Sequence, residues 1–349
     1  MTTRTAWRSA FLCIAVVVGL MAPPRASAAD EALGIALEGY PYPYPARFMP
    51  ITLGGEELRL AYMDAPPIGA PNGRTVLLLH GRNFPSSYWA PTIKALSAAG
   101  YRVIAPDQIG FGKSSKPDFA YSFDAMARVT LALLDSLGVD RFELVGHSMG
   151  GMLAVRIARA YGARIDHLVL YSPIGLEDYR FYVPPVTDEQ LMAQERSLTS
   201  DGYRKQLMTN YALSLAPEAI EPFVDIRERI RQSGEYPRWL RSFVASYQMI
   251  YAQPVVHEIP LIDRPTLFIM GGADHNAPGR AYAPPEAQRK MGENAELAKT
   301  LAAHMKNANC VVFDGIGHLG HLEAEQRFNA TLLEFLGKSE PGPASSSVK

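Results

Sequence analysis

A serine held between glycines is the residue of the chain best suited to chemistry. Residues 146–150 read Gly-His-Ser-Met-Gly, with β-forming residues before them and a segment suited to a helix after them. This pattern predicts a sharp strand–turn–helix elbow that lifts the Ser148 hydroxyl clear of a sheet, because glycines let strand and helix approach closely. The alternative is a glycine-rich helix start in which Ser148 is only a cap. Whether the chain also supplies a base and a carboxylate for Ser148 decides between these two interpretations.

A nucleophilic serine needs a base and a carboxylate as partners. His318 is the predicted base, because it lies in a glycine-containing loop directly after the last apolar run. His321 is the alternative base, but it stands where the closing helical segment begins. Asp274, in a glycine-containing loop after another apolar run, is predicted to orient the imidazole. Either partner alone fits an ordinary loop or turn role, but the order Ser148, Asp274, His318 indicates a catalytic triad.

The predicted strands place these three residues at one edge of a sheet. Apolar runs alternate with helical patterns over most of the chain, which indicates a parallel, doubly wound α/β sheet. Parallel strands end at the same edge, and functional sites of such sheets form there. Residues 51–63, interrupted at Gly54–Gly55, are predicted to form a hairpin of two edge strands. The central strands are predicted at residues 75–79, 102–105, 142–145, 168–171, 265–270 and 310–313.

A helical insertion interrupts this alternation. Between residues 175 and 254 no sheet-type apolar run occurs, and apolar residues recur at helical spacing instead. Thr187 and Gln190 have the spacing of a capping box that opens a helix. We therefore predict a helical cap at residues 175–255, inserted between two parts of the core at 29–174 and 256–337. The other helices are predicted at residues 87–99, 122–137, 285–305 and 323–336, with an extended strap at 40–45, where tyrosine alternates with proline.

Residues 1–28 are predicted to be a signal peptide. Arg4 and Arg8 precede an apolar run at 10–21, and the Ala-Ser-Ala sequence that ends at Ala28 fits a cleavage site. The alternative is a membrane anchor, but the run is shorter than the roughly 20 apolar residues of a spanning helix. We therefore expect export to the periplasm or the exterior, cleavage near Ala28 and no membrane span in the mature protein. Residues 338–349 are predicted to form a disordered tail.

Composition narrows the classes of function. The chain has 349 residues and a net charge of −1, which allows a large α/β core and gives no basic excess that would indicate nucleic acid. Cleavage would remove Cys13 and leave Cys310 alone, so no intramolecular disulfide is expected. Cys310 lies in an apolar run and is predicted to be a buried core residue rather than a nucleophile. No spacing of histidine, cysteine and carboxylate residues indicates a metal site, and no motif indicates a cofactor.

The chain resembles the α/β-hydrolase fold family from about Phe48 to Leu336. The resemblance implies an α/β-hydrolase fold whose helical cap covers the site. It also implies an oxyanion hole made by the backbone amides of Met149 and Arg82, with Asn83 as an alternative to Arg82. The motifs that carry the resemblance are His80–Gly81, residues 106–114, residues 146–150, Asp274 and Gly317–His318.

Other polar residues near these motifs are predicted to be structural. In the family that the chain resembles, the positions of His80 and Asp107 tie neighbouring loops together beneath the site. His147 is adjacent to Ser148 inside the elbow, so its side chain is not expected to face the same substrate. His275 is predicted to be a loop residue.

The triad and the resemblance together imply a serine hydrolase. The expected reaction is cleavage of a carboxylic ester of a small molecule through an acyl-enzyme on Ser148, without a metal or cofactor. The serine excludes the branches with an aspartate nucleophile, which are the haloalkane dehalogenases and epoxide hydrolases. C–C bond hydrolases of ring-cleavage products, lactonases, cofactor-free peroxidases and proline iminopeptidases remain alternatives. A non-catalytic binding protein on the same fold is the alternative of another class, and such proteins usually lack a triad residue.

Overall fold

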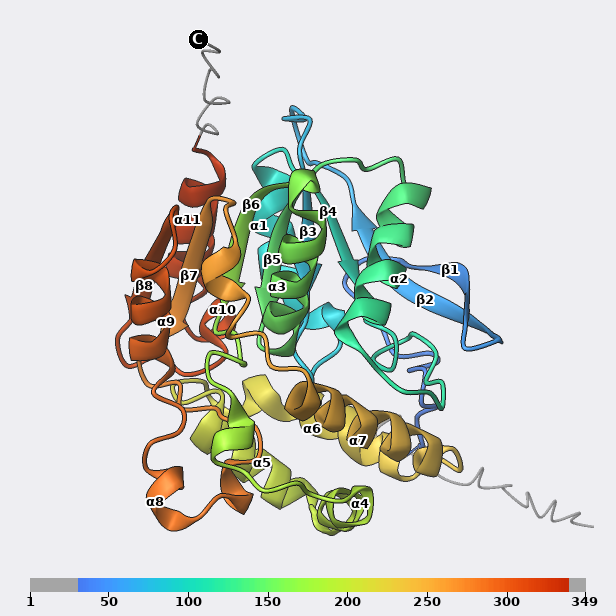
Figure 1. Cartoon of the computed structure of the whole chain (residues 1–349). Coiled ribbons are helices and arrows are strands. Elements are labelled where there is room, and N and C mark those ends of the chain that lie inside the picture. The colour runs from blue at the N-terminus through green and yellow to red at the C-terminus, as the bar shows by residue number, and fades with distance from the viewer. Residues whose placement is uncertain (1–30, 339–349) are drawn as a thin grey trace, which may run out of the picture. The chain divides into compact units, whose positions relative to one another are not determined.

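The computed structural model describes residues 31–338, and its centre is one sheet of eight strands in the order β1-β2-β4-β3-β5-β6-β7-β8 (Figure 1). Each predicted central strand is present, within a few residues of its expected ends. The strands are β1 (Ala46–Leu53), β2 (Glu56–Ala65), β3 (Thr75–Leu79), β4 (Arg102–Pro106), β5 (Phe142–His147), β6 (Ile165–Tyr171), β7 (Thr266–Gly271) and β8 (Ala308–Phe313).

The sheet is mostly parallel, as the sequence predicts. The strands β4, β3, β5, β6, β7 and β8 pair in parallel, whereas β1 pairs antiparallel with β2, and β2 antiparallel with β4. The expected hairpin therefore exists, but only β1 is an edge strand, because β2 has a neighbour on each side. The parallel strands all end toward one edge of the sheet, which is where the predicted site residues follow them.

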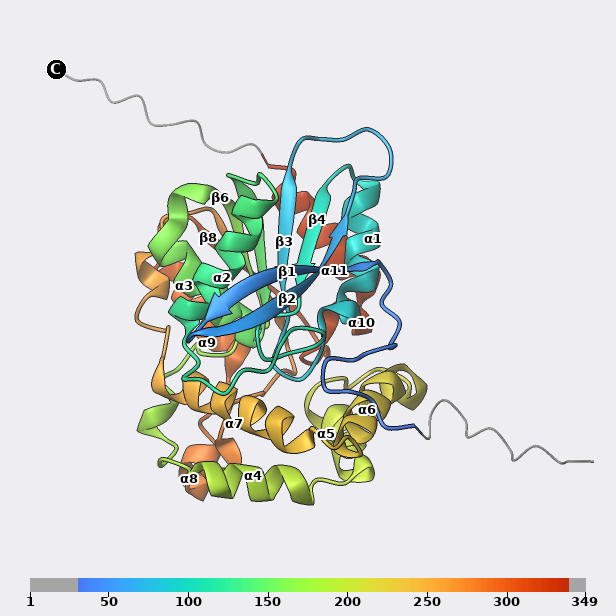
Figure 2. The same ribbon diagram turned by 90° about the vertical axis from the view of Figure 1, so that its right-hand side faces the viewer.

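Helices cover both faces of the sheet. The first face carries α1 (Ala90–Ala98), α10 (Gly320–Glu323) and α11 (Glu325–Leu336), and the other carries α2 (Phe123–Ser136), α3 (Met149–Tyr161) and α9 (Asn294–Ala303) (Figure 2). Strand side chains alternate between the two cores: Leu77 and Leu79 pack on the side of α2 and α3, and Val76 and Leu78 on the side of α1 and α11. Alternation of this kind is the period of two that a pleated strand imposes.

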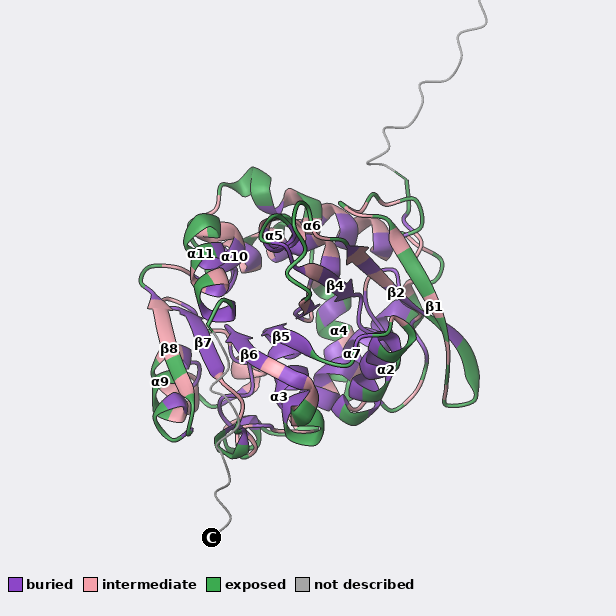
Figure 3. Ribbon diagram, turned by 90° about the horizontal axis from the view of Figure 1, so that it is seen from above, coloured by how far each residue is buried: buried purple, intermediate pink, exposed green. Residues whose placement is uncertain are grey.

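Burial falls off toward the outer strand β8. The residues of β5 and β7 are all buried, whereas β8 is mostly half-buried (Figure 3). Cys310 is half-buried, so the prediction that it is a buried core residue is only partly correct. The reason is that β8 is the last strand of the sheet and has a neighbouring strand on one side only. Burial raises the pKa of the Cys310 thiol to about 11, which disfavours the reactive thiolate.

The predicted helix at 285–305 is two helices. The first, α8 (Pro285–Gln288), is a single turn, and α9 begins only at Asn294. Gly292 stands between them with a φ of 82°, in the left-handed region that ends helices. A Cβ there would lie 2.5 Å from the carbonyl oxygen of His275, so the chain needs glycine at this break.

Four helices lie between β6 and β7: α4 (Asp188–Ser197), α5 (Ser200–Asn210), α6 (Pro217–Arg231) and α7 (Tyr236–Ala252). Figure 1 shows them gathered beyond one end of the sheet. The capping box of Thr187 and Gln190 opens α4 as predicted. Residues 32–338 belong to one compact unit, so the predicted cap boundaries at 175 and 255 stay predictions.

The signal-peptide prediction and nearly all of the predicted C-terminal tail lie outside the described residues. Within residues 31–338, none of the helices has the length and apolar character needed to cross a membrane.

The elbow at the end of β5 gives a test of the fold. A Cβ on Gly146 would lie 2.3 Å from the carbonyl oxygen of Gly150, so strand and helix must separate to admit it. We expect Gly146→Ala to lower the free energy of unfolding by about 1–3 kcal/mol or more, measured by urea denaturation. The control is Gly234→Ala, because a Cβ at exposed Gly234 meets nothing within 4 Å. Equal stability of the two variants would contradict this account of the elbow.

Candidate active site

Ser148 stands at the turn between β5 and α3 with a strained backbone. Its φ of 56° and ψ of −120° are unusual for a residue with a side chain, and strain of this kind persists only where the surroundings enforce it. The amide of Ser148 donates to Tyr171 in the neighbouring strand, at 3.2 Å, and its carbonyl accepts from Gly151 in the first turn of α3, at 2.9 Å. The sequence prediction of a sharp elbow on Ser148 is thus matched by the backbone.

Asp274 and His318 meet across the ends of β7 and β8. Oδ2 of Asp274 lies 2.7 Å from Nδ1 of His318, and both side chains are buried. Oδ1 of Asp274 accepts from the Asn276 amide at 3.0 Å, which fixes the carboxylate within its own loop. A carboxylate in this position holds Nδ1 protonated and leaves Nε2 as the basic nitrogen of the imidazole.

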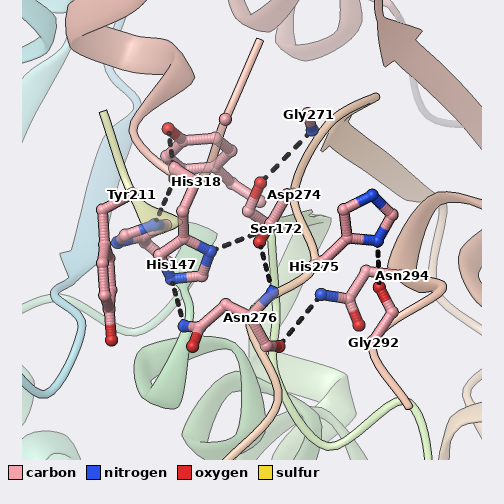
Figure 4. A network of polar contacts seen from close by, with 12 residues as sticks. His147, Ser172, Tyr211, Gly271, Asp274, His275, Asn276, Gly292, Asn294 and His318 are labelled. Carbon is pink, nitrogen blue, oxygen red and sulfur yellow. Dashed lines mark hydrogen bonds and ion pairs between the residues drawn. The ribbon is translucent and has the colours of Figure 1, made fainter. Parts of the chain in front are cut away.

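The free nitrogen of His318 has a partner other than Ser148. Nδ2 of Asn276 lies 3.3 Å from His318 Nε2, so His318 sits between Asp274 and Asn276 (Figure 4). The structure records no hydrogen bond between Ser148 and His318. It therefore brings the base and its carboxylate together and places Ser148 in the same cavity as Asn276. Catalytic hydrogen bonds are often long or misaligned before substrate binds.

Three backbone amides in the loops next to Ser148 have no acceptor in the described part of the protein. Met149 is the first residue of α3, and Arg82 and Asn83 follow the end of β3; among residues 31–338 none of these three N–H groups has a hydrogen-bond partner. Gly81 brings the second loop close, since a Cβ there would lie 3.0 Å from Cβ of Ser148. An oxyanion hole made by the amides of Met149 and Arg82, with Asn83 as an alternative to Arg82, stays a prediction.

A buried polar chain joins the loop after β3 to the loop that carries His318. Nε2 of His147 lies 2.9 Å from the carbonyl oxygen of His318, so this nitrogen carries the proton. Nδ1 of His147 then accepts from the Tyr88 hydroxyl at 2.7 Å, and that oxygen accepts from the Gly81 amide at 3.1 Å. His147 is a positioning residue that faces away from the cavity, as its predicted structural role requires.

The other predicted structural residues tie loops together. His80 Nε2 accepts from the Gln108 amide at 2.9 Å, and burial lowers the His80 pKa. Asp107 accepts from the amides of Ser86 and Lys113, each at 2.7 Å. The predicted surface strap reaches the same carboxylate, because the Tyr42 hydroxyl donates to it at 2.7 Å.

His275 and His321, the other two histidines considered in the sequence analysis, have hydrogen-bond partners other than Ser148. Nδ1 of His275 lies 3.0 Å from the carbonyl oxygen of Gly292, so His275 is a loop residue as predicted. His321, the alternative base, is buried under the site with its Nδ1 3.0 Å from the Tyr171 hydroxyl. Burial, with a smaller contribution from His318, lowers the pKa of His321 to about 3, so His321 stays neutral. Only His318 is paired with Asp274.

A cavity of about 580 Å³ opens in front of Ser148. All four helices between β6 and β7 contribute to its wall, and so does the loop after β7 at residues 275–282. The lining is largely polar and includes three arginines. In residues 31–338 there is no group of three or more histidine, cysteine, aspartate or glutamate side chains placed to hold a metal ion. The cavity thus has the size and position of a small-molecule site.

The sequence model of the alpha/beta hydrolase family matches residues 76–331. The chain belongs to this family. It is 31% identical to a 2-hydroxy-6-oxononadienedioate/2-hydroxy-6-oxononatrienedioate hydrolase of Paraburkholderia phymatum, over 84% of this chain and 96% of the relative. A protein of the same name from Burkholderia vietnamiensis is 30% identical over 83% of this chain and 95% of that one.

A solved structure supports the same fold. The crystal structure of a probable hydrolytic enzyme from Pseudomonas aeruginosa PAO1 has 38% sequence identity and a TM-score of 0.86, and the match covers 88% of this chain and 99% of that one. The predicted α/β-hydrolase fold and family are therefore confirmed.

Sequence reasoning missed two residues that contact His318. Asn276 follows Asp274 by two positions, and the ring of Tyr211 meets the His318 ring edge-on at 5.2 Å between centroids. The position of Asn276, a polar residue just after Asp274, could have indicated its role. The sequence holds no such signal for Tyr211, because it lies at the end of α5 and reaches the site only through tertiary packing.

The buried neutral histidines predict how stability depends on pH. The ordinary pKa of His321 is 6.5 and its folded value is about 3, so below pH 6.5 the unfolded chain takes up a proton that the folded chain does not. The free energy of unfolding should therefore fall on acidification, by about 2 kcal/mol between pH 7 and pH 5 for His321 alone. Burial also lowers the pKa of neighbouring His147, which adds to this loss.

Urea denaturation at both pH values tests this for wild type and His321→Gln. We expect the variant to lose about 2 kcal/mol less than wild type on acidification. His304→Gln serves as the control, because His304 is exposed and should leave the pH profile unchanged. An identical profile in His321→Gln and wild type would refute a buried neutral His321.

Proposed function

We propose that the protein is a serine hydrolase that cleaves a carboxylic ester of a small molecule through an acyl-enzyme on Ser148. The observation that carries the proposal is the buried pair of Asp274 and His318, 2.7 Å apart, at the sheet edge where Ser148 stands on a strained turn. The cavity in front of Ser148 supports a small-molecule substrate. The proposed location is outside the cytoplasm, on the strength of the N-terminal sequence pattern alone.

In the proposed reaction His318 accepts the proton of Ser148 as the serine oxygen attacks the carbonyl carbon. Nε2 of His318 must exchange the Asn276 amide for the Ser148 hydroxyl before it can accept this proton. Asp274 keeps Nδ1 protonated and stabilises the imidazolium that forms. The negative oxygen of the intermediate lies against the amides of Met149 and Arg82.

Collapse of the intermediate breaks the ester bond. The alcohol leaves with the proton that His318 held, and the acyl group stays on Ser148. A water molecule then gives a proton to His318 and attacks the acyl carbon, which releases the carboxylic acid and restores the serine. Each step uses only groups that the site already holds and water.

Hydrolysis of a carbon–carbon bond is the second candidate. The observation in its favour is the 31% identity to a 2-hydroxy-6-oxononadienedioate/2-hydroxy-6-oxononatrienedioate hydrolase. The compounds in that name contain a ketone and carboxylates but no ester, so their hydrolysis breaks a bond between carbon atoms. A serine, a histidine and an oxyanion hole serve both reactions, and the substrate decides between them.

Removing the nucleophile tests the proposed function. We expect Ser148→Ala to lower kcat on p-nitrophenyl esters by roughly 10⁴–10⁶-fold, while the melting temperature stays within a few degrees. A fluorophosphonate should label wild type on Ser148 and leave the variant unlabelled, as mass spectrometry of the peptides would show. A variant that remains active and folded would overturn the assignment of Ser148.

Two substrates separate the candidate reactions. We expect turnover of p-nitrophenyl butyrate to exceed that of 2-hydroxy-6-oxonona-2,4-dienedioate by at least about 10-fold in kcat/KM, with products identified by chromatography. The reverse order would make carbon–carbon bond hydrolysis the function and retain the same nucleophile. Ser148→Ala is the control for both substrates, since background hydrolysis continues in its presence.

A further inference from the structure

The side chain of Arg82 extends from the candidate oxyanion loop to the cap. Its Nε donates to Oγ of Ser246 at 2.9 Å, and its Nη2 donates to the carbonyl oxygen of Phe243 at 2.7 Å. The guanidinium carbon lies 3.6 Å from the centroid of the Phe243 ring. These contacts fix the guanidinium in place, so little freedom remains to be lost when it binds a ligand.

No carboxylate pairs with the charge of Arg82, which lies over the ring of Phe243. Among residues 31–338 no carboxylate lies within ion-pair distance of Arg82, and Nη1 donates no hydrogen bond. Burial lowers the pKa of Arg82 to about 10, so the guanidinium is still charged at neutral pH. Arg82 is half-buried and lines the cavity, so its charge is accessible to a ligand that enters there.

The cavity that Arg82 lines is positively charged. Its wall also holds Arg227, Arg280 and one carboxylate, Glu195. Glu195 is bonded to Arg227, although it also attracts Arg82 from a longer distance. Arg280 is bonded to carbonyl oxygens of its own loop, those of Gln288 and His275. Neither Arg82 nor Arg280 forms an ion pair among residues 31–338, but only Arg82 follows Gly81, the residue that packs against Ser148.

We infer that Arg82 binds a carboxylate of the substrate, so that the preferred substrates are acyl compounds with a second, anionic group. This inference rests on the proposed function and adds the substrate class. Arg82 and Ser148 line the same cavity, so one molecule bound there can contact both. The planar guanidinium retains N–H groups that match the two oxygens of a carboxylate.

A mechanical role is the competing account of Arg82. The two bonds to α7 join the core to the cap, and the guanidinium also lies over the Phe243 ring of α7, so these contacts by themselves give an arginine a structural role. The two accounts differ in what Arg82→Gln and Arg82→Lys do. Loss of the contacts with α7 should lower the turnover of all substrates alike, whereas loss of an anion site should lower only the turnover of negatively charged substrates.

The kinetic test uses two esters of equal size. The first is p-nitrophenyl hydrogen adipate, which carries a free carboxylate, and the second is p-nitrophenyl adipamate, in which an uncharged amide replaces it. We expect wild type to prefer the carboxylate ester by about 10–100-fold in kcat/KM, mainly through KM. Arg82→Gln should abolish this preference, and Arg82→Lys should restore part of it.

Arg280→Gln is the matched control, because it removes another positive charge from the same cavity. We expect it to change the preference by less than about 3-fold, because Arg280 belongs to the loop after β7 and not to the loop whose Gly81 packs against Ser148. A preference that survives Arg82→Gln, or that disappears only in Arg280→Gln, overturns the assignment to Arg82. An equal loss on both esters in Arg82→Gln supports the mechanical role instead.

A binding measurement keeps this inference separate from the proposed function. Calorimetric titration of adipate into the Ser148→Ala protein needs no turnover. We expect adipate to bind at least about 10-fold more tightly to Ser148→Ala than to the double variant with Arg82→Gln, and adipamide to bind both equally. If neither ester is hydrolysed, the proposed ester chemistry fails, and the titration alone decides whether Arg82 binds carboxylates. Equal adipate affinity in the two proteins refutes the anion site.

Discussion

The hydrogen bond between Asp274 and His318 depends on how closely the ends of β7 and β8 approach each other. A Cβ on Gly271, the last residue of β7, would lie 2.0 Å from the carbonyl oxygen of Gly317. Only glycine at 271 lets the loop before His318 lie against the end of β7. This close approach brings Nδ1 of His318 within 2.7 Å of Oδ2 of Asp274. The site is thus made by backbone packing first, and the side-chain contact follows from it.

The polar groups beneath the site hold this arrangement without adding charge. His147 joins the carbonyl of His318 to Tyr88, and Tyr88 in turn meets the amide of Gly81. Burial lowers the pKa of His147 and, to about 3, that of His321, so both rings stay neutral beside His318. Two further cations would oppose the imidazolium that the proposed reaction forms on His318, and the low dielectric of the interior would strengthen that repulsion.

The sequence was sufficient for the parts of the site that depend on local order. The small residues around Ser148 predict the elbow, and the order of serine, aspartate and histidine after apolar runs predicts one sheet edge, because topology alone brings the ends of parallel strands together. The residues that it could not supply are set by tertiary packing. Tyr211 and the loop at 275–282 approach Ser148 only because the cap helices and the chain after β7 fold over the same edge. No periodicity within either segment reports that contact.

Arg82 has a place in two parts of the proposed reaction. Its backbone amide has no protein acceptor and is the proposed donor to the oxyanion, while its side chain reaches α7 and lines the cavity. The backbone role tolerates any residue with an N–H, so the choice of arginine needs a separate reason. Structural support for α7 uses the donors, and the contact with the Phe243 ring uses the positive charge, which is also accessible to a negatively charged ligand in the cavity. The guanidinium therefore bears on the choice of substrate, whereas the proposed triad would act on any acyl bond that reached it.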